Sequence, residues 1–229
     1  MSAIATNLQA IRERIARAAI AAGRKPDSVH LLAVSKTKPL ADVLAAAEAG
    51  QHAFGENYVQ EGAEKSLATV DRGFEWHFIG PLQSNKTRQV AEHFAWVHSI
   101  ERLKIAERLS AQRPEALSPL QVCVQVNVSG ETSKSGCAPD EAVALCLAVA
   151  ALPNLTLRGL MAIPEPCDDP ALQREPFRRL KLIADAVRAA GVPLDTLSMG
   201  MSHDLEAAVA EGATIVRVGT AIFGERNYT

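Results

Sequence analysis

The stretch LLAVSKTKP, residues 31–39, contains the unit from which the rest of the fold can be read. A short apolar run, typical of a strand buried on both faces, leads into two lysines before Pro39 ends the segment. Because side chains alternate along a strand, Leu32, Val34 and Lys36 share one face, so that Lys36 continues an apolar surface. Either its stem lies along the core and its amine reaches water, or the amine is held in a partly dry site as a nucleophile.

The same succession of strand and helix recurs along the whole chain. Strands are predicted at 30–35, 52–55, 75–79, 96–99, 121–127, 155–162, 195–199 and 214–218. Helices are predicted at 40–49, 57–68, 84–93, 101–111, 139–151, 171–190 and 203–211, several ending at a glycine such as Gly50, Gly191 or Gly212. An additional helix over 2–22 carries an apolar stripe suited to packing.

Eight strands with intervening helices indicate a parallel sheet, and their number favours a closed (β/α)₈ TIM barrel. An open doubly wound sheet would carry a G-x-G-x-x-G turn after its first strand, and Ser35-Lys36-Thr37-Lys38 does not resemble one. No linker, low-complexity block or repeat divides the chain, so a single domain over residues 1–229 is expected.

Composition narrows the classes of function. Apolar residues make up 48% of the 229 residues and charged residues 22%, with a net charge of −2, so nucleic acid is not expected as a partner. No run is long and apolar enough for a membrane span, and no secretory signal is visible. The four cysteines form no C-x-x-C pair and no metal-ligand spacing, which indicates a cytoplasmic protein without a metal site.

In a barrel of this kind, chemistry takes place at the carboxyl ends of the strands. These ends carry Lys36, Asn57, His77, the run from Ser198 to Ser202, and the run from Arg217 to Thr220. Loops after the seventh and eighth strands frequently hold phosphate, so Ser202, Gly219 and Thr220 are candidates for a phosphate cradle. The alternatives are a helix capped by Ser202 and an interior arginine at 217 paired with a buried acid. A phosphorylated aldehyde would satisfy both the cradle and Lys36.

Several blocks of the sequence resemble one family along nearly the whole chain. They are LLAVSKTKP, FGENYVQE, WHFIGPLQSNK, VNVSGETSKSG, RGLMAIP, SMGMSHD and VRVGTAIFGERNY, in that order. The chain is similar to the pyridoxal phosphate (PLP) homeostasis proteins, relatives of the barrel domain of alanine racemase with PLP fold type III.

The resemblance implies a role for each candidate residue. It implies that Lys36 carries PLP as a covalent aldimine and that Arg217 faces the pyridine nitrogen. Ser202, Gly219 and Thr220 would hold the phosphate, Asn57 and His77 would flank the cofactor, and Ser198 and Met199 would lie close by. Lys38 and Lys134 are interpreted as surface lysines that could form a secondary PLP site.

Three hypotheses about function remain open from the sequence. The first is a PLP carrier that supplies the cofactor to apo-enzymes, without strong catalysis and therefore with no catalytic residue assigned. The second is a PLP-dependent amino-acid racemase, and the third is a cofactor-free class I aldolase. A racemase needs an acid–base group on each side of the substrate carbon, and in a sequence ending at Thr229 only one candidate is found. We therefore expect a monomeric carrier.

Overall fold

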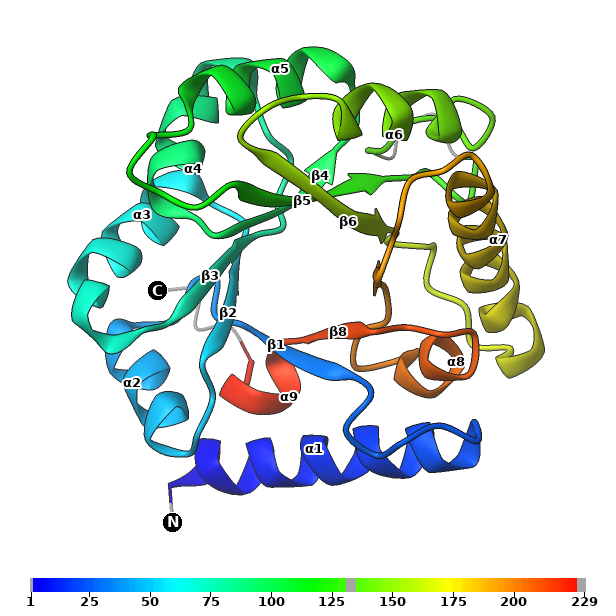
Figure 1. Ribbon diagram of the computed structural model, residues 1–229. Coiled ribbons are helices and arrows are strands. Elements are labelled where there is room, and N and C mark those ends of the chain that lie inside the picture. Colours follow the sequence, from blue (N-terminus) through cyan, green and yellow to red (C-terminus); the bar gives the residue numbers. More distant parts are fainter. Residues whose placement is uncertain (1, 131–134, 226–229) are drawn as a thin grey trace.

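A computed structural model describes residues 2–130 and 135–225 of the chain. Eight parallel strands pair in chain order, and β8 returns to pair with β1, so the sheet is a closed barrel (Figure 1). The predicted (β/α)₈ barrel is confirmed. The strands are β1 His30–Val34, β2 Ala53–Glu56, β3 Glu75–Phe78, β4 Trp96–Ile100, β5 Leu120–Gln125, β6 Leu155–Met161, β7 Thr196–Ser198 and β8 Ile215–Val218.

Helices alternate with these strands and form the outer layer. They are α1 Ala3–Ala21, α2 Leu40–Glu48, α3 Val59–Ala68, α4 Thr87–His93, α5 Leu103–Gln112, α6 Ala142–Ala150, α7 Pro170–Ala189, α8 Leu205–Ala210 and α9 Thr220–Phe223. Short 3₁₀ turns, η1 Val70–Arg72 and η2 Ser84–Lys86, precede β3 and α4. All the predicted helices are present, and most begin or end a few residues inside the predicted limits.

Apolar side chains are buried on both faces of the barrel wall. The large core lies between the strands and the helices and includes Phe54, Phe78 and Leu160, each fully buried. Inside the barrel there are two smaller clusters, one around Leu32, Ile79 and Ile215 and the other around Trp96, Cys123 and Met161. Burial on both faces explains why the strands appear in the sequence as nearly continuous apolar runs.

Helix α1 takes the place of an eighth outer helix. The segment after β8 forms only the four-residue α9, and α1 closes the helical layer between α2 and α8 (Figure 1). Its buried side chains include Leu8, Ile11 and Ile15, which belong to the predicted stripe. Asn7 Nδ2 donates to the carbonyl of Ile222 at 3.0 Å, so the two ends of the barrel chain are held together.

Glycine at 159 is required where β6 meets β7. A Cβ placed on Gly159 would overlap the carbonyl oxygen of Thr196, so any larger residue would push the two strands apart. The β5–β6 pairing also shifts its register beside this glycine. The close approach therefore depends on a residue without a side chain.

The described residues lack two features that mark other classes of protein. Among them, no helix is both long and apolar enough to cross a membrane. No group of three or more histidine, cysteine or acidic side chains gathers there as a metal site would require. The four cysteines are free, with Cys123 in β5 and Cys146 in α6 buried as expected.

Candidate binding site at the carboxyl end of the barrel

Lys36, Gly219 and Thr220 come together at the carboxyl end of the barrel. Lys36 follows β1 and Gly219 follows β8, and these strands are neighbours, with Ala33 opposite Val218. The three residues line one small cavity of about 30 Å³, together with Val34, Lys38 and Gly224. Residues more than 180 positions apart in the sequence are thus adjacent, as the closed barrel predicts.

Gly219 allows the backbone after β8 to pass close to β1. A Cβ at this position would lie 3.1 Å from the carbonyl oxygen of Val34 and 3.3 Å from the Val34 Cβ. Gly219 also precedes α9, whose first turn is closed by hydrogen bonds from Ile222 N and Phe223 N to the Gly219 carbonyl. The glycine therefore brings the Thr220 backbone up to the same cavity as the Lys36 side chain.

Arg217 lies inside the barrel and is 3% exposed. Its Nη1 donates to Ser198 Oγ at 2.7 Å and its Nη2 donates to the carbonyl of Ala162 at 2.9 Å. Burial lowers the pKa of Arg217 to about 10, and the charge of Asp204 acts in the opposite direction. The guanidinium therefore stays charged at neutral pH. Within the described chain its side-chain hydrogen bonds go to a hydroxyl and a carbonyl, not to the buried acid considered as an alternative.

A chain of hydrogen bonds continues from Ser198 through the barrel interior. Ser198 Oγ lies 2.8 Å from His98 Nδ1, His98 Nε2 lies 2.9 Å from His77 Nδ1, and His77 Nε2 lies 2.8 Å from Glu75 Oε1. Burial lowers the pKa of His77, and that of His98 well below the ordinary value, so both rings are neutral at pH 7. Bonding to His77 lowers the pKa of Glu75, which is ionised and can only accept.

These protonation states leave one arrangement of hydrogens that satisfies every bond. His77 must donate to Glu75 through Nε2, so its Nδ1 accepts from His98 Nε2. His98 Nδ1 must then accept from the Ser198 hydroxyl, which leaves the Ser198 oxygen to accept from Arg217. The guanidinium at one end of the barrel is therefore linked to a carboxylate at the other end.

His77 lies deeper in the barrel than the sequence suggested. Its ring stacks on Trp96 with centroids 5.2 Å apart, and it lines a cavity of about 880 Å³ at the amino-terminal mouth. Glu75 and Arg158 line the same cavity, on the opposite side of the barrel from Lys36. His77 is two residues before the end of the predicted strand, so it faces the barrel interior below the carboxyl-end rim. This placement does not favour the expectation that His77 flanks the cofactor.

The remaining predicted residues lie near the carboxyl end in different ways. Asn57 follows β2, and its Oδ1 is buried without a hydrogen-bond partner among the described residues. The Met199 side chain is fully buried in the outer core, so only its backbone can contribute to the rim. Ser202 is partly exposed, and its carbonyl accepts from Arg14 Nη1 at 2.8 Å. Ser202 does not cap α8, because the helix begins at Leu205 with Asp204 as its N-cap.

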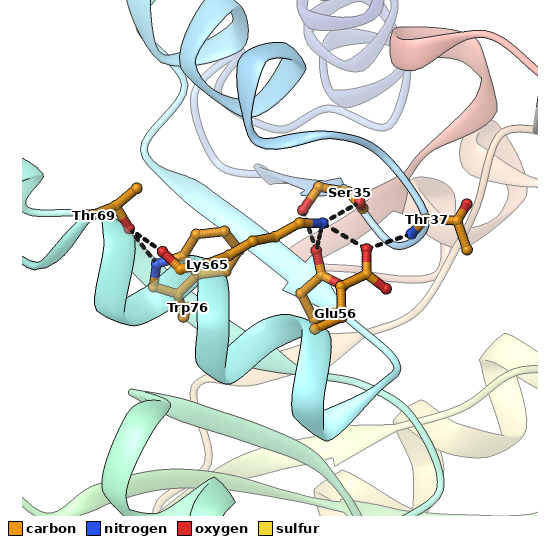
Figure 2. A network of polar contacts seen from close by, with 7 residues as sticks. Ser35, Thr37, Glu56, Lys65, Thr69 and Trp76 are labelled. Carbon is orange, nitrogen blue, oxygen red and sulfur yellow. Dashed lines mark hydrogen bonds and ion pairs between the residues drawn. The ribbon is translucent and has the colours of Figure 1, made fainter.

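Sequence reasoning missed a polar cluster that surrounds the backbone of Lys36 (Figure 2). Lys65 Nζ donates to the Ser35 carbonyl at 2.8 Å and to Glu56 Oε1 and Glu61 Oε1 at 2.7 Å each. Ser35 Oγ donates to Glu56 Oε1, and the Thr37 N–H donates to Glu61 Oε1, both at 2.7 Å. The only signal in the sequence is the spacing of Glu61 and Lys65, which fits an ordinary surface pair on a helix.

Comparison with known proteins places the chain in a family. Residues 3–227 match the family model described as alanine racemase, N-terminal domain. The pyridoxal phosphate homeostasis protein of Pseudomonas aeruginosa is 61% identical over 229 residues, covering 100% of this chain and 98% of that protein. The Escherichia coli protein of the same name is 53% identical over 232 residues, covering 100% and 99%. This chain belongs to the pyridoxal phosphate homeostasis protein family.

Solved structures agree with membership of this family. PipY of Synechococcus elongatus with PLP bound superposes with a TM-score of 0.84 at 37% identity, covering 96% of this chain and 100% of that chain. Alanine racemase from Corynebacterium glutamicum gives a TM-score of 0.72 at 18% identity over 97% of this chain and 61% of that chain, which shows a shared fold.

The carboxyl-end residues of this family member fit the cofactor that PipY holds. Lys36 supplies a primary amine beside Gly219 and Thr220, and Arg217 is a buried cation. The orphaned acceptor Asn57 Oδ1 is a buried polar atom of the kind that a bound group satisfies. Lys134 and Tyr228 lie outside the described residues.

Proposed function

We propose that this chain binds PLP at the carboxyl end of its barrel, covalently through Lys36, and holds it in reserve for other enzymes. The observation that carries the proposal is that Lys36, Gly219 and Thr220 line one cavity, although they lie at opposite ends of the barrel sequence. The proposed binding domain is the single barrel over residues 1–229. The proposed contact residues are Lys36, Asn57, Ser198, Ser202, Arg217, Gly219 and Thr220, with the backbone of Met199.

Bound PLP supplies an aldehyde, which condenses with a primary amine and releases one water. In this chain Lys36 Nζ provides that amine. Thr220 and Ser202 provide hydroxyls, and the Gly219–Thr220 backbone provides N–H groups for a phosphate. Arg217 provides a fixed positive charge whose orientation is set by Ser198 and Ala162. Together these groups bind and orient one small phosphorylated aldehyde.

Storage and supply are favoured over turnover. The curated relatives are named for PLP homeostasis. Racemisation would need a second acid–base group opposite Lys36, and Tyr58, the tyrosine of the described chain, is 55% exposed at the start of α3. The proposed partners are PLP and apo-enzymes that receive it. A cytoplasmic monomer is proposed because the cysteines are free and a closed barrel leaves no strand edge to pair.

The experiment is to load the purified protein with PLP, record its visible absorption, reduce it with borohydride and map the modified peptide by mass spectrometry. We expect one pyridoxyl group on Lys36. Lys36→Ala should fold as the wild type does and should lose the label, because the change removes a side chain at the rim and leaves the core intact. A label found only on Lys38 or another lysine, or no label, would contradict the proposal. Light scattering tests the monomer.

A further inference from the structure

We propose that Glu61 and Lys65 of α3, with Glu56 of β2, are positioning residues that fix the backbone on both sides of Lys36. The inference rests on the proposed role of Lys36 as the PLP-bearing residue. None of the three was a candidate from the sequence, and none lines the cavity at the rim. They act through Ser35 and Thr37, the residues that flank Lys36 in the chain.

Two hydrogen bonds that involve side chains hold the residue before Lys36, in addition to its backbone hydrogen bonds with Gly55 and Lys38. Ser35 is fully buried; its carbonyl accepts from Lys65 Nζ at 2.8 Å and its hydroxyl donates to Glu56 Oε1 at 2.7 Å. Figure 2 shows the Lys65 side chain extending from α3 to reach Ser35 and Glu56 together. The end of β1 is therefore tied to β2 and α3 by side chains as well as by the strand ladder.

The residue after Lys36 is held in a strained conformation. Thr37 has φ of +63°, and only Asn154 shares positive φ with it among the described non-glycine residues. A β-branched residue is rarely found in this left-handed region, so the surrounding contacts must impose it. Two hydrogen bonds hold this turn, one from the Thr37 N–H to Glu61 Oε1 at 2.7 Å and one from the Lys38 N–H to the Ser35 carbonyl at 3.0 Å. Lys36 lies inside this turn, so the conformation held at Thr37 helps to set the direction of the Lys36 side chain.

Lys65 joins the two anchors into one unit. Its three hydrogen bonds, to Ser35, Glu56 and Glu61, use all three donors of an ammonium group. The Lys65 side chain is 8% exposed and that of Glu56 is not exposed at all. A buried ion pair of this kind contributes little net stability compared with apolar packing, and its better-supported use is to specify one geometry. Here the geometry specified is that of residues 35–37.

The test compares two replacements of Glu61 in the full chain. Glu61→Ala removes the acceptor for Thr37 N–H, whereas Glu61→Gln keeps an oxygen at the same place. Glu61 is partly exposed, at 26% of its side chain, so both variants should fold. Glu64→Ala is the matched control, because it removes the same charge from an exposed position of the same helix.

Two measurements are made on each protein. Hydrogen exchange of the Thr37 amide, followed by NMR without PLP, reports the anchor itself. The rate of PLP attachment to Lys36, trapped with borohydride and quantified by peptide mapping, reports the consequence. For Glu61→Ala we expect faster exchange at Thr37 and attachment slower by about tenfold or more, since a misplacement of about 1 Å has effects of this size. Glu61→Gln and Glu64→Ala should stay within about twofold of the wild type in both measurements.

The outcomes separate this inference from the function on which it rests. If the wild type carries PLP on Lys36 and Glu61→Ala attaches it at the wild-type rate, the positioning role is refuted and the carrier function stands. If Glu64→Ala slows attachment as much as Glu61→Ala does, the effect is one of helix charge and the role is again refuted. If the wild type carries no PLP on Lys36, both proposals fall.

Discussion

The buried histidine chain predicts how stability depends on pH. His77 and His98 are 2% and 0% exposed, and burial lowers the pKa of both, that of His98 furthest. In the unfolded chain each takes up a proton near its ordinary pKa of about 6.5. The folded rings stay neutral at that pH, so the unfolded state binds more protons. Stability from this source is therefore complete above about pH 6.5 and is lost as the pH falls towards the folded-state values.

The size of this pH dependence follows from the number of histidine rings in the buried hydrogen-bond chain. One proton bound only by the unfolded state changes the free energy of unfolding by about 1.4 kcal/mol per pH unit. Each ring that stays neutral in the folded protein contributes up to this slope below about pH 6.5, and His98, whose pKa burial lowers furthest, contributes the most. His98→Gln should lower this slope by up to about 1.4 kcal/mol per pH unit. Burial raises the pKa of Glu56, so Glu56 changes the slope of stability with pH in the opposite direction. This contribution is the same in the wild type and in His98→Gln and does not affect their difference.

Urea titrations between about pH 7.5 and 5.5 would measure the slope as the change in unfolding free energy. His203→Gln is the control, because His203 is an exposed histidine outside the buried hydrogen-bond chain. If the wild type and His98→Gln have the same slope, the rings are protonated in the folded state and the reasoning fails. The tautomer assignment of the whole chain from Arg217 to Glu75 would then be wrong as well.

Four further outcomes are expected. Pyridoxal without its phosphate should bind at least about tenfold more weakly than PLP in parallel titrations, because it loses charge-assisted hydrogen bonds to Ser202 and Thr220 worth roughly 1.5–3 kcal/mol each; equal affinity would place the phosphate elsewhere. The PLP-loaded protein should pass PLP to an apo-enzyme and show little turnover of amino acids, and a rate of about 1 s⁻¹ or faster by chiral chromatography would support a racemase. In the folded protein only Cys167 should react with a thiol reagent at neutral pH, since burial raises the pKa of Cys137 to about 11 and that of Cys146 to about 12; more than one fast thiol would contradict this. Gly159→Ala should cost about 3 kcal/mol of stability in urea unfolding, and a wild-type midpoint would mean that β6 and β7 can separate without cost.

The succession of strands and helices was sufficient to predict the fold, and the alternation of side chains along the first strand predicted part of the site. It placed Lys36 on the face of Leu32 and Val34, and the structure has Val34 and Lys36 lining the same cavity. In a closed barrel whose strands follow chain order, the first and eighth strands are neighbours. Lys36 and Gly219 are therefore expected to meet. These predictions succeeded because period and chain order are local properties that the sequence expresses directly.

The depth of a side chain in the barrel and its hydrogen-bond partners could not be predicted in the same way. Alternation turned His77 inward, but the pattern of one strand shows only which face a residue is on and not how deep it lies, so it did not show that His77 lines the amino-terminal cavity. His98 alternates with Trp96 in the same manner and could have been noticed as a second interior histidine. Lys65 resembles a surface lysine because its acceptors, Ser35 and Glu56, come from other elements. Such contacts depend on tertiary packing, which no local pattern records.

The pairing of β1 with β8 has a consequence for the order of events during folding. The Asn7–Ile222 hydrogen bond joins residues 215 positions apart in the sequence. The proposed cofactor-binding residues likewise lie on both sides of the junction between β1 and β8. A ribosome must therefore release nearly the whole chain before the pocket exists, and a growing chain holds Lys36 without the groups that would orient its ligand. A ligand that contacts groups on both β1 and β8 binds only the closed barrel. It therefore stabilises the closed barrel against opening between these strands, and the stabilisation grows with the ligand concentration.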